Sequence, residues 1–482
     1  MTSLEGAAPL SSRGAARLKG AAAYTAMVFG ALGVFLIVNW IGGGLSAPAA
    51  ASAPAASAAA KGKPDILVHV LITLAAVVVA GQIVGRLFRA IGQPPVVGEV
   101  LAGILIGPSL LGRIWPEATA FLMPPEIGPF IAVIAQLGVI LYMFLVGLEL
   151  NPAVLRERAG TTLAISHASI AAPFVCGAVL ALYLFPRLSD DGVSFTNFAL
   201  FMGVALSVTA FPVLARILTD RGLQTTPLGV TALAAAAADD VTAWCLLALI
   251  VGVAQASVTG ALVTLALTAA FVAAMLLIVR PLLVRVLPRY DTAPLSEPLI
   301  ACVFVAVLLS ALATEAIGIH ALFGAFLLGA VTPHDSRLAQ AFAHKLESVV
   351  TVLLLPAFFA SVGMRTQIGL VSGFEHWFLC ALIIAVATLG KFGGTYAAAR
   401  VTGLDHRNAA GLGVLMNTRG LMELIVLNIG LEMKVISPTL FAMMVIMALA
   451  TTIATGPILW LLGVHRDPSL APPGVRAAGS EA

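Results

Sequence analysis

The chain has 482 residues, of which 60% are hydrophobic and only 10% are charged. A water-soluble protein of this length could not solvate such a surface, so the composition excludes that class and indicates an all-α polytopic membrane protein in a lipid bilayer. The formal net charge of +3 is too small to suggest a nucleic-acid partner.

The first 45 residues contain a polar tail and then an apolar run from Tyr24 to Leu45. This run is longer than the roughly 7–15 apolar residues of a cleaved signal peptide. It therefore favours a retained transmembrane helix or signal anchor over a signal that is removed. Residues 46–64 are rich in Ala, Pro and Ser, which is typical of a linker.

Thirteen further apolar spans follow and define a transmembrane domain at residues 65–464. We place them at residues 65–88, 93–111, 128–149, 161–186, 196–218, 226–254, 259–284, 296–316, 318–333, 347–366, 373–399, 407–431 and 436–464. Residues 465–482 form a short cytoplasmic tail. With the N-terminus in the cytoplasm, most Lys and Arg residues fall in cytoplasmic segments. We therefore expect a multi-pass protein of the cell inner membrane with both termini in the cytoplasm.

The spans divide into two groups of six that are joined by a single helix. The second group then runs opposite to the first, which is the inverted repeat typical of secondary transporters. Phe144–Leu148 in the first group resembles Ala360–Met364 in the second. The likeness extends to paired glycines, Gly103 with Gly107 and Gly324 with Gly329. These matches share a common offset, so they support the repeat.

Two spans in equivalent positions of the repeat are interrupted. The span at 196–218 contains Ser207, Thr209 and Pro212 near its centre, and a central proline removes a backbone hydrogen bond. The span at 407–431 is interrupted by Asn417–Gly420. Paired broken helices indicate a transporter site, because freed carbonyls and helix ends can face ions. An ordinary proline kink is the alternative.

The span Thr226–Gln255 carries Asp239 and Asp240 side by side near its middle. At ~1.5 Å per residue the span is long enough to cross a bilayer core of ~30 Å, so both carboxylates lie near the midplane. An ionised carboxylate there costs several kcal/mol unless it is paired, protonated or bound to a cation. The pattern indicates a site where cations and protons compete. The alternative is a pair of acids that only stabilises the fold.

Lys391 lies within the apolar span at 373–399. A buried ammonium needs an acid, and either Asp239 or Asp240 would serve. Burial favours the neutral forms of such a pair and pairing favours the charged forms, so a proton or a cation could break it. A purely structural salt bridge is the alternative.

Arg419 stays charged at any relevant pH and needs an acidic partner inside the membrane. Glu423, Glu99 and Glu315 are the candidates. We interpret Arg419 and its partner as structural or gating groups. Glu99 could equally form a hydrogen bond between packed helices.

Several motifs in a fixed order carry a resemblance to a known family. They are Gly98-Glu99, Ala102-Gly103, Gly107-Pro108-Ser109, Leu145-Val146-Gly147-Leu148-Glu149, Thr209-Ala210-Phe211-Pro212, Asp239-Asp240, His320-Ala321-Leu322-Phe323-Gly324-Ala325-Phe326 and Asn417-Thr418-Arg419-Gly420-Leu421. From about residue 65 to 464 the chain resembles the monovalent cation:proton antiporter-2 family, which includes the Kef-type and plant CHX-type transporters.

The resemblance implies a dimer of thirteen-helix protomers, each with a scaffold domain and a mobile core domain. It also implies two crossed broken helices in the core and an elevator-like movement. Asp240 matches the ion-binding aspartate of the family, and Lys391 matches the core lysine that pairs with an aspartate. Asp239 matches a neighbour that is Asp in electrogenic members, and Thr209 lies in the broken-helix site. The Asp-Asp pair departs from the Gln-Asp of Kef proteins and the Asn-Asp common in CHX proteins, which points to an electrogenic sodium antiporter.

We therefore expect an antiporter that exchanges Na⁺ or K⁺ for H⁺, with no cofactor and no enzymatic activity. Asp240 would bind the cation, and Asp239, Thr209, Ser207 and freed carbonyls would be further ion-binding groups. Asp239 would also pair with Lys391. A cation channel or a cation-coupled symporter on the same frame is an alternative. An intramembrane aspartyl protease is another, but it requires two aspartates on different helices, and here they are adjacent on one.

Overall fold

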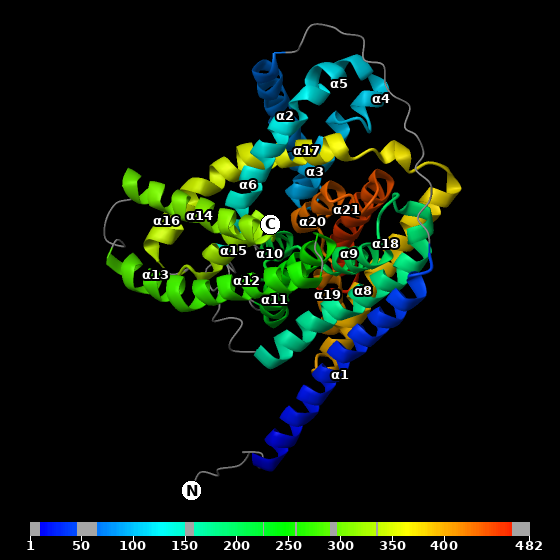
Figure 1. The fold of residues 1–482 in the computed structure, drawn as a ribbon, viewed down its shortest axis with the longest axis vertical. Coiled ribbons are helices and arrows are strands. Elements are labelled where there is room, and N and C mark those ends of the chain that lie inside the picture. Colours follow the sequence, from blue (N-terminus) through cyan, green and yellow to red (C-terminus); the bar gives the residue numbers. More distant parts are fainter. Residues whose placement is uncertain are drawn as a thin grey trace, which may run out of the picture.

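The structure, a computed structural model, describes residues 10–45, 65–149, 159–224, 226–255, 258–289, 296–333 and 336–464. All regular structure in these ranges is helical (Figure 1). Eleven of the described helices are long and apolar enough to cross a bilayer, or twelve if one bent pair counts as a span. The all-α polytopic fold is therefore confirmed, and the number of thirteen crossings stays a prediction. The predicted linker at 46–64 and the tail at 465–482 lie outside the described residues.

The helices follow the predicted spans in order. The first part of the chain forms α1 (Leu10–Gly42), α2 (Ile66–Ala90), α3 (Pro95–Ile106), α4 (Leu111–Ile114), α5 (Pro116–Leu122), α6 (Gly128–Glu149), α8 (Ala159–Leu188), α9 (Phe195–Ser207), α10 (Phe211–Asp220) and α11 (Pro227–Gln255). The second part forms α12 (Val258–Ala274), α13 (Arg280–Val286), α14 (Glu297–Ile317), α15 (Ala321–Val331), α16 (Arg337–Val349), α17 (Leu355–Arg365), α18 (Gly373–Val401), α19 (His406–Met416), α20 (Leu421–Glu432) and α21 (Pro438–Leu461).

Side-chain caps define where several helices begin. Asp65 accepts from the backbone N–H of Val68 at the start of α2, and Ser194 accepts from that of Asn197 in α9. Each of these caps satisfies one of the donors that a helix start leaves free.

The break between α9 and α10 lies just before Pro212. Helix α9 ends at Ser207, and α10 begins at Phe211 with Pro212 in its first turn. A proline in a first turn needs no backbone donor, whereas inside a continuous helix it would remove a hydrogen bond and clash with the preceding turn. The chain therefore opens ahead of the proline, at 208–210, rather than kinking around it.

Two groups of helices pack together. The first, which we call the scaffold half, consists of α2, α3, α6, α14, α15 and α17. The second, which we call the core half, consists of α8, α9, α10, α11, α18, α19, α20 and α21 (Figure 1). Equivalent helices make equivalent contacts, since α6 packs on α15 as α17 packs on α3, and α8 packs on α9 as α18 packs on α19.

The glycines of the predicted repeat lie at these equivalent contacts. A Cβ at Gly147 of α6 would collide with the backbone of Phe326 and Gly329 in α15. A Cβ at Gly363 of α17 would collide with the backbone of Gly103 in α3. Small residues allow helix backbones to approach this closely in membranes. The short sequence likeness between the two groups therefore has a packing reason.

Helix α1 precedes the repeat and packs on the core half along α8 and α9 (Figure 1). The Thr196 hydroxyl donates to Asn39 Oδ1 at 2.6 Å, and the rings of Phe35 and Phe174 contact each other. The helix starts at Leu10, well before the apolar run, because residues 15–23 are rich in good helix formers such as Ala, Arg, Leu and Lys.

Candidate cation site

The two adjacent aspartates lie in the middle of α11, inside the core half. Asp239 is 0% exposed and Asp240 is 1% exposed. Helix α11 packs against α8, α9, α10 and α19 at this level of the bundle. Consecutive side chains of a helix point about 100° apart, so the two carboxylates face different neighbours.

Both carboxylate oxygens of Asp239 accept hydrogen bonds. Ser166 Oγ donates to Oδ1 at 2.6 Å, and Oδ2 accepts from Ser169 Oγ at 2.7 Å, Thr209 Oγ1 at 2.8 Å and Lys391 Nζ at 2.9 Å. Three hydroxyls and one ammonium are the partners that a buried carboxylate needs if it is to remain charged.

Lys391 forms its ion pair with Asp239, so the structure decides between the two acids that the sequence left open. Its ammonium is 0% exposed and also donates to the backbone carbonyl of Ser207 at 2.5 Å. The Ser207 hydroxyl itself points elsewhere and donates to the carbonyls of Gly203 and Ile170. The contribution of Ser207 to the site is therefore its carbonyl and not its side chain.

The two helix breaks meet beside Asp239. The Thr209 hydroxyl lies 3.1 Å from the Met416 carbonyl, and the Ala210 N–H donates to the Thr418 carbonyl at 3.0 Å. Helices α19 and α20 are bent by 43° at their break. The predicted pair of interrupted helices thus converges on the aspartates, and the predicted crossing of these helices stays a prediction.

Arg419 lies in the second break and pairs with Glu423. Its Nη1 is 2.8 Å from Glu423 Oε2, and both side chains are fully buried. The guanidinium also donates to the carbonyls of Ala205 and Leu206 at 3.0 and 2.6 Å. These carbonyls belong to the last turn of α9, where a helix has unsatisfied acceptors and a partial negative charge. Arg419 therefore joins the two broken helices.

The other two acids proposed for Arg419 lie elsewhere. Glu99 is half-buried on α3, where its side chain packs near Gly81 and Gly85 of α2. Glu315 accepts from the backbone N–H of Ala321 at 2.9 Å. The sequence alone did not separate these three acids.

Asp240 differs from Asp239 in having no hydrogen-bond partner among the described residues for either carboxylate oxygen. Asn417 Oδ1 and Thr418 Oγ1 in the second break are likewise buried and unpaired there. Unpaired buried oxygens are costly, and native proteins leave few of them. They are the atoms that a proton or a dehydrated cation would satisfy.

The Thr209 hydroxyl donates to Asp239 and not to Asp240. The reason is the direction of the side chains around α11, which places Asp239 toward the first break. The predicted contribution of Thr209 to cation binding at Asp240 stays a prediction. The polar side chains of the second break that carry unpaired oxygens are Asn417 and Thr418.

Ser166 and Ser169 are the site residues that the sequence analysis missed. They lie three residues apart on α8, so they share one helix face, and both are fully buried. Two serines at this spacing in an apolar span were the available signal.

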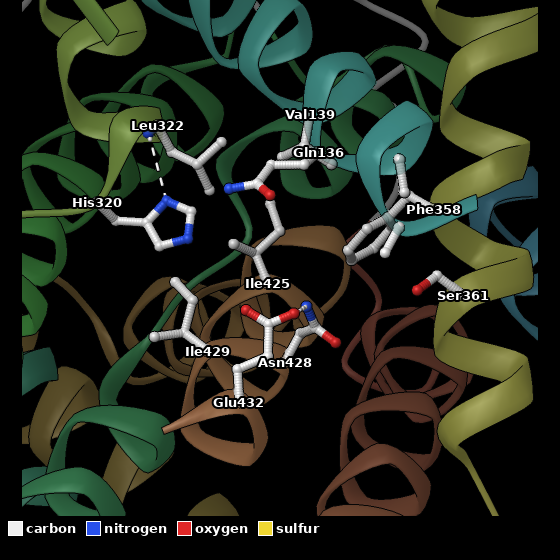
Figure 2. Close-up of a pocket in the computed structure, with 12 residues that line it drawn as sticks. Gln136, Val139, His320, Leu322, Phe358, Ser361, Ile425, Asn428, Ile429 and Glu432 are labelled. Carbon is white, nitrogen blue, oxygen red and sulfur yellow. Dashed lines mark hydrogen bonds between the residues drawn. The ribbon is translucent and has the colours of Figure 1, made fainter. Parts of the chain in front are cut away.

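A small pocket lies between the two halves, where α20 faces α6, α15 and α17. Its lining is mostly apolar and includes the polar side chains of Gln136, His320, Asn428 and Glu432 (Figure 2). Arg365 at the end of α17 donates to Asn428 Oδ1 at 2.8 Å and to Glu432 Oε1 at 2.9 Å. This ion pair connects the scaffold half to the core half.

Residues 72–462 match the family model described as sodium/hydrogen exchanger, transmembrane. The chain is 43% identical over 398 residues to the Na⁺/H⁺ antiporter NhaS4 of Synechocystis, with 82% of this chain and 97% of that protein aligned.

Longer eukaryotic proteins match as well. Cation/H⁺ antiporter 20 of Arabidopsis thaliana is 38% identical over 82% of this chain and 49% of its own length. K⁺/H⁺ antiporter 1 of Saccharomyces cerevisiae is 34% identical over 78% and 44%. The chain therefore spans about half the length of these two relatives. The solved structure of the sodium proton antiporter MjNhaP1 of Methanocaldococcus jannaschii has the same fold, with a TM-score of 0.61, 16% identity and coverage of 83% of this chain and 99% of that one.

Proposed function

The chain belongs to the sodium/hydrogen exchanger family, and from that premise we propose that it exchanges Na⁺ or K⁺ for H⁺ with Asp240 as the binding carboxylate. The family consists of multi-pass transporters and not of enzymes. The observation that carries the proposal is the buried Asp240 carboxylate, whose two oxygens have no partner among the described residues, beside an Asp239 that is fully occupied.

Competition for one carboxylate is enough to couple the two fluxes. A proton or a cation can neutralise Asp240, but the two cannot do so together. The empty site would carry an unpaired charge, and moving such a charge through the membrane interior costs several kcal/mol. Only the loaded forms cross at an appreciable rate, so each cation moves against protons.

The ligands of the cation come from the second break as well as from α11. Asn417 Oδ1 and Thr418 Oγ1 are buried oxygens without a partner among the described residues, and they follow Met416, whose carbonyl contacts Thr209. Carboxylate, amide and hydroxyl oxygens are hard ligands, which suit an alkali-metal cation.

We further propose that exchange is electrogenic, with two protons for one cation. One proton leaves Asp240 when the cation binds. The second leaves the buried Asp239–Lys391 pair, from the carboxyl or from the ammonium group. One positive charge then enters for every two that leave.

Alternating access would follow from movement of the core half against the scaffold half, in an elevator-type step. The pocket and the Arg365–Glu432 ion pair between the halves support this division, because polar, partly exposed contacts are easier to exchange than a packed apolar interface. We propose that the scaffold half also forms a homodimer in the inner membrane.

The test is proton movement in sealed vesicles on addition of Na⁺ or K⁺, followed with a pH-sensitive dye. The wild type should dissipate a preset pH gradient, and the cation that does so is the substrate. Asp240→Asn should abolish the response. Asp190→Asn makes the same chemical change in the exposed loop between α8 and α9 and should transport normally. If correctly inserted wild-type protein moves no protons with either cation, the antiporter proposal fails.

A further inference from the structure

The backbone of the second break is held by one side chain of α21. Thr452 Oγ1 accepts from the Arg419 N–H at 2.9 Å and donates to the Arg419 carbonyl at 2.5 Å. We call this pair of hydrogen bonds the Thr452 clamp. Arg419 lies between α19 and α20, outside both helices, so its backbone groups depend on partners of this kind. The clamp is buried, since Thr452 is 1% exposed.

The other two buried threonines in this part of α21 behave differently. Thr451 Oγ1 donates to the carbonyls of Met447 and Ala448, and Thr455 Oγ1 donates to the carbonyl of Thr451. Such bonds within one helix are the usual way in which a threonine satisfies its hydroxyl. Thr452 instead directs its hydroxyl out of its own helix and onto the break.

On the basis of the proposed exchange, we propose that Thr452 is a positioning residue that sets the affinity of the site for its cation. The residue that it clamps directly follows Asn417 and Thr418, whose unpaired oxygens are the proposed ligands of the second break. The Thr418 carbonyl is held in turn by the Ala210 N–H of the first break. The backbone that carries the ligands is therefore fixed on both sides.

A fixed backbone increases affinity because the ligands are already ordered in the empty site. A ligand oxygen that can move must be immobilised when the cation binds, and the free energy of that step is lost from the binding. Release of the clamp would free the N–H and the carbonyl of Arg419 together. Binding should weaken, while the carboxylate of Asp240 itself is unchanged.

The side-chain contacts of Arg419 do not replace the clamp. Its guanidinium bonds the carbonyls of Ala205 and Leu206 and the carboxylate of Glu423. A long side chain with several rotatable bonds can keep these contacts in more than one backbone conformation. The Thr452 hydroxyl acts on the backbone groups directly.

The scaffold half offers the break no hydrogen-bonding side chain at this point. Val96, Val97 and Val100 of α3 line a small pocket together with Arg419 and Thr452. Valine side chains neither donate nor accept, so the clamp comes from α21, which packs on both α19 and α20 within the core half. The clamp can therefore stay intact when the core half moves against the scaffold half.

The experiment is the cation dependence of proton exchange in vesicles for Thr452→Val, which removes the hydroxyl with little change in shape. The apparent KM for the cation should rise about five- to tenfold, and the rate at saturating cation should stay within about twofold. Thr452→Ser retains the hydroxyl and should restore the wild-type KM. Thr452→Cys replaces the hydroxyl with a weak donor and acceptor, so it should give an intermediate KM, and it serves if the valine variant does not insert.

Thr451→Val and Thr455→Val are the matched controls, because they make the same change at buried positions of the same helix that do not reach the break. Their KM should stay at the wild-type value. An unchanged KM in Thr452→Val, an equal rise in the controls, or a fall in the saturating rate alone would overturn the inference. Wild-type protein still exchanges in each of these cases, so the proposed function stands; wild-type protein that moves no protons overturns both.

Discussion

Replacement of Lys391 with Met would leave the Asp239 carboxylate buried with only hydroxyl partners. The Nζ to Oδ2 distance is 2.9 Å, and both side chains are 0% exposed. Removal of one partner of such a buried pair costs about 3–5 kcal/mol, because the remaining charge is uncompensated. The three hydroxyls offset part of this cost, so we expect a loss of about 3 kcal/mol in the free energy of unfolding.

A double-mutant cycle separates this effect from a loss of packing. Met has nearly the length of the lysine side chain, so the cavity term is small. Asp239→Asn in the Lys391→Met background removes the uncompensated charge and should recover at least about 2 kcal/mol of the loss. Unfolding in mixed detergent micelles, followed by circular dichroism, measures the four free energies. If the two substitutions are additive, Asp239 and Lys391 do not form the ion pair, and the division of roles between the aspartates is refuted.

Three further predictions concern other parts of the molecule. Gly147→Ala and Gly363→Ala should each lower the free energy of unfolding by about 1–3 kcal/mol in thermal assays, because the added Cβ meets the backbone of the facing helix. Gly33→Ala is the control, since its added Cβ enters open space and should have no effect. Arg365→Gln should change the free energy of unfolding by less than about 1 kcal/mol, since this ion pair is half-exposed; a larger loss would mean that it holds the two halves together. Hydrogen bonds from the Asn408 side chain and backbone lower the pKa of the Asp405 carboxyl. Protection of the first turn of α19 against hydrogen exchange should therefore be complete above about pH 4 and fall as the pH drops through the lowered pKa, and Asp405→Asn should abolish this pH dependence.

Much of the fold could be predicted from the sequence because a bilayer permits few backbone conformations. Backbone polar groups in lipid must be satisfied within a helix, so long apolar spans predict helices and buried charges predict function. The spans, the interruption at Asn417–Gly420 and the glycines at 147 and 363 are all local patterns. Each of these patterns reflects a physical requirement on the residues of its own segment.

The roles of the two aspartates could not be read in this way. Asp239 and Asp240 are chemically identical neighbours, and their difference arises from what α8 and α18 place against them. The sequence could not show that the Thr209 hydroxyl bonds Asp239, because a turn of about 100° between adjacent residues decides which carboxylate it meets.

The sequence by itself determined that this is a membrane-embedded helical bundle with carboxylates, an ammonium and two broken helices at mid-membrane depth. Those properties depend on the hydropathy of contiguous segments. The tertiary structure alone decided that Asp239 is saturated, that Asp240 is unpaired among the described residues, and that Arg419 bonds Glu423 and the end of α9. Arg419 and Glu423 are one turn apart. The other properties depend on which side chains from neighbouring helices reach each group, and that is fixed only when the helices pack.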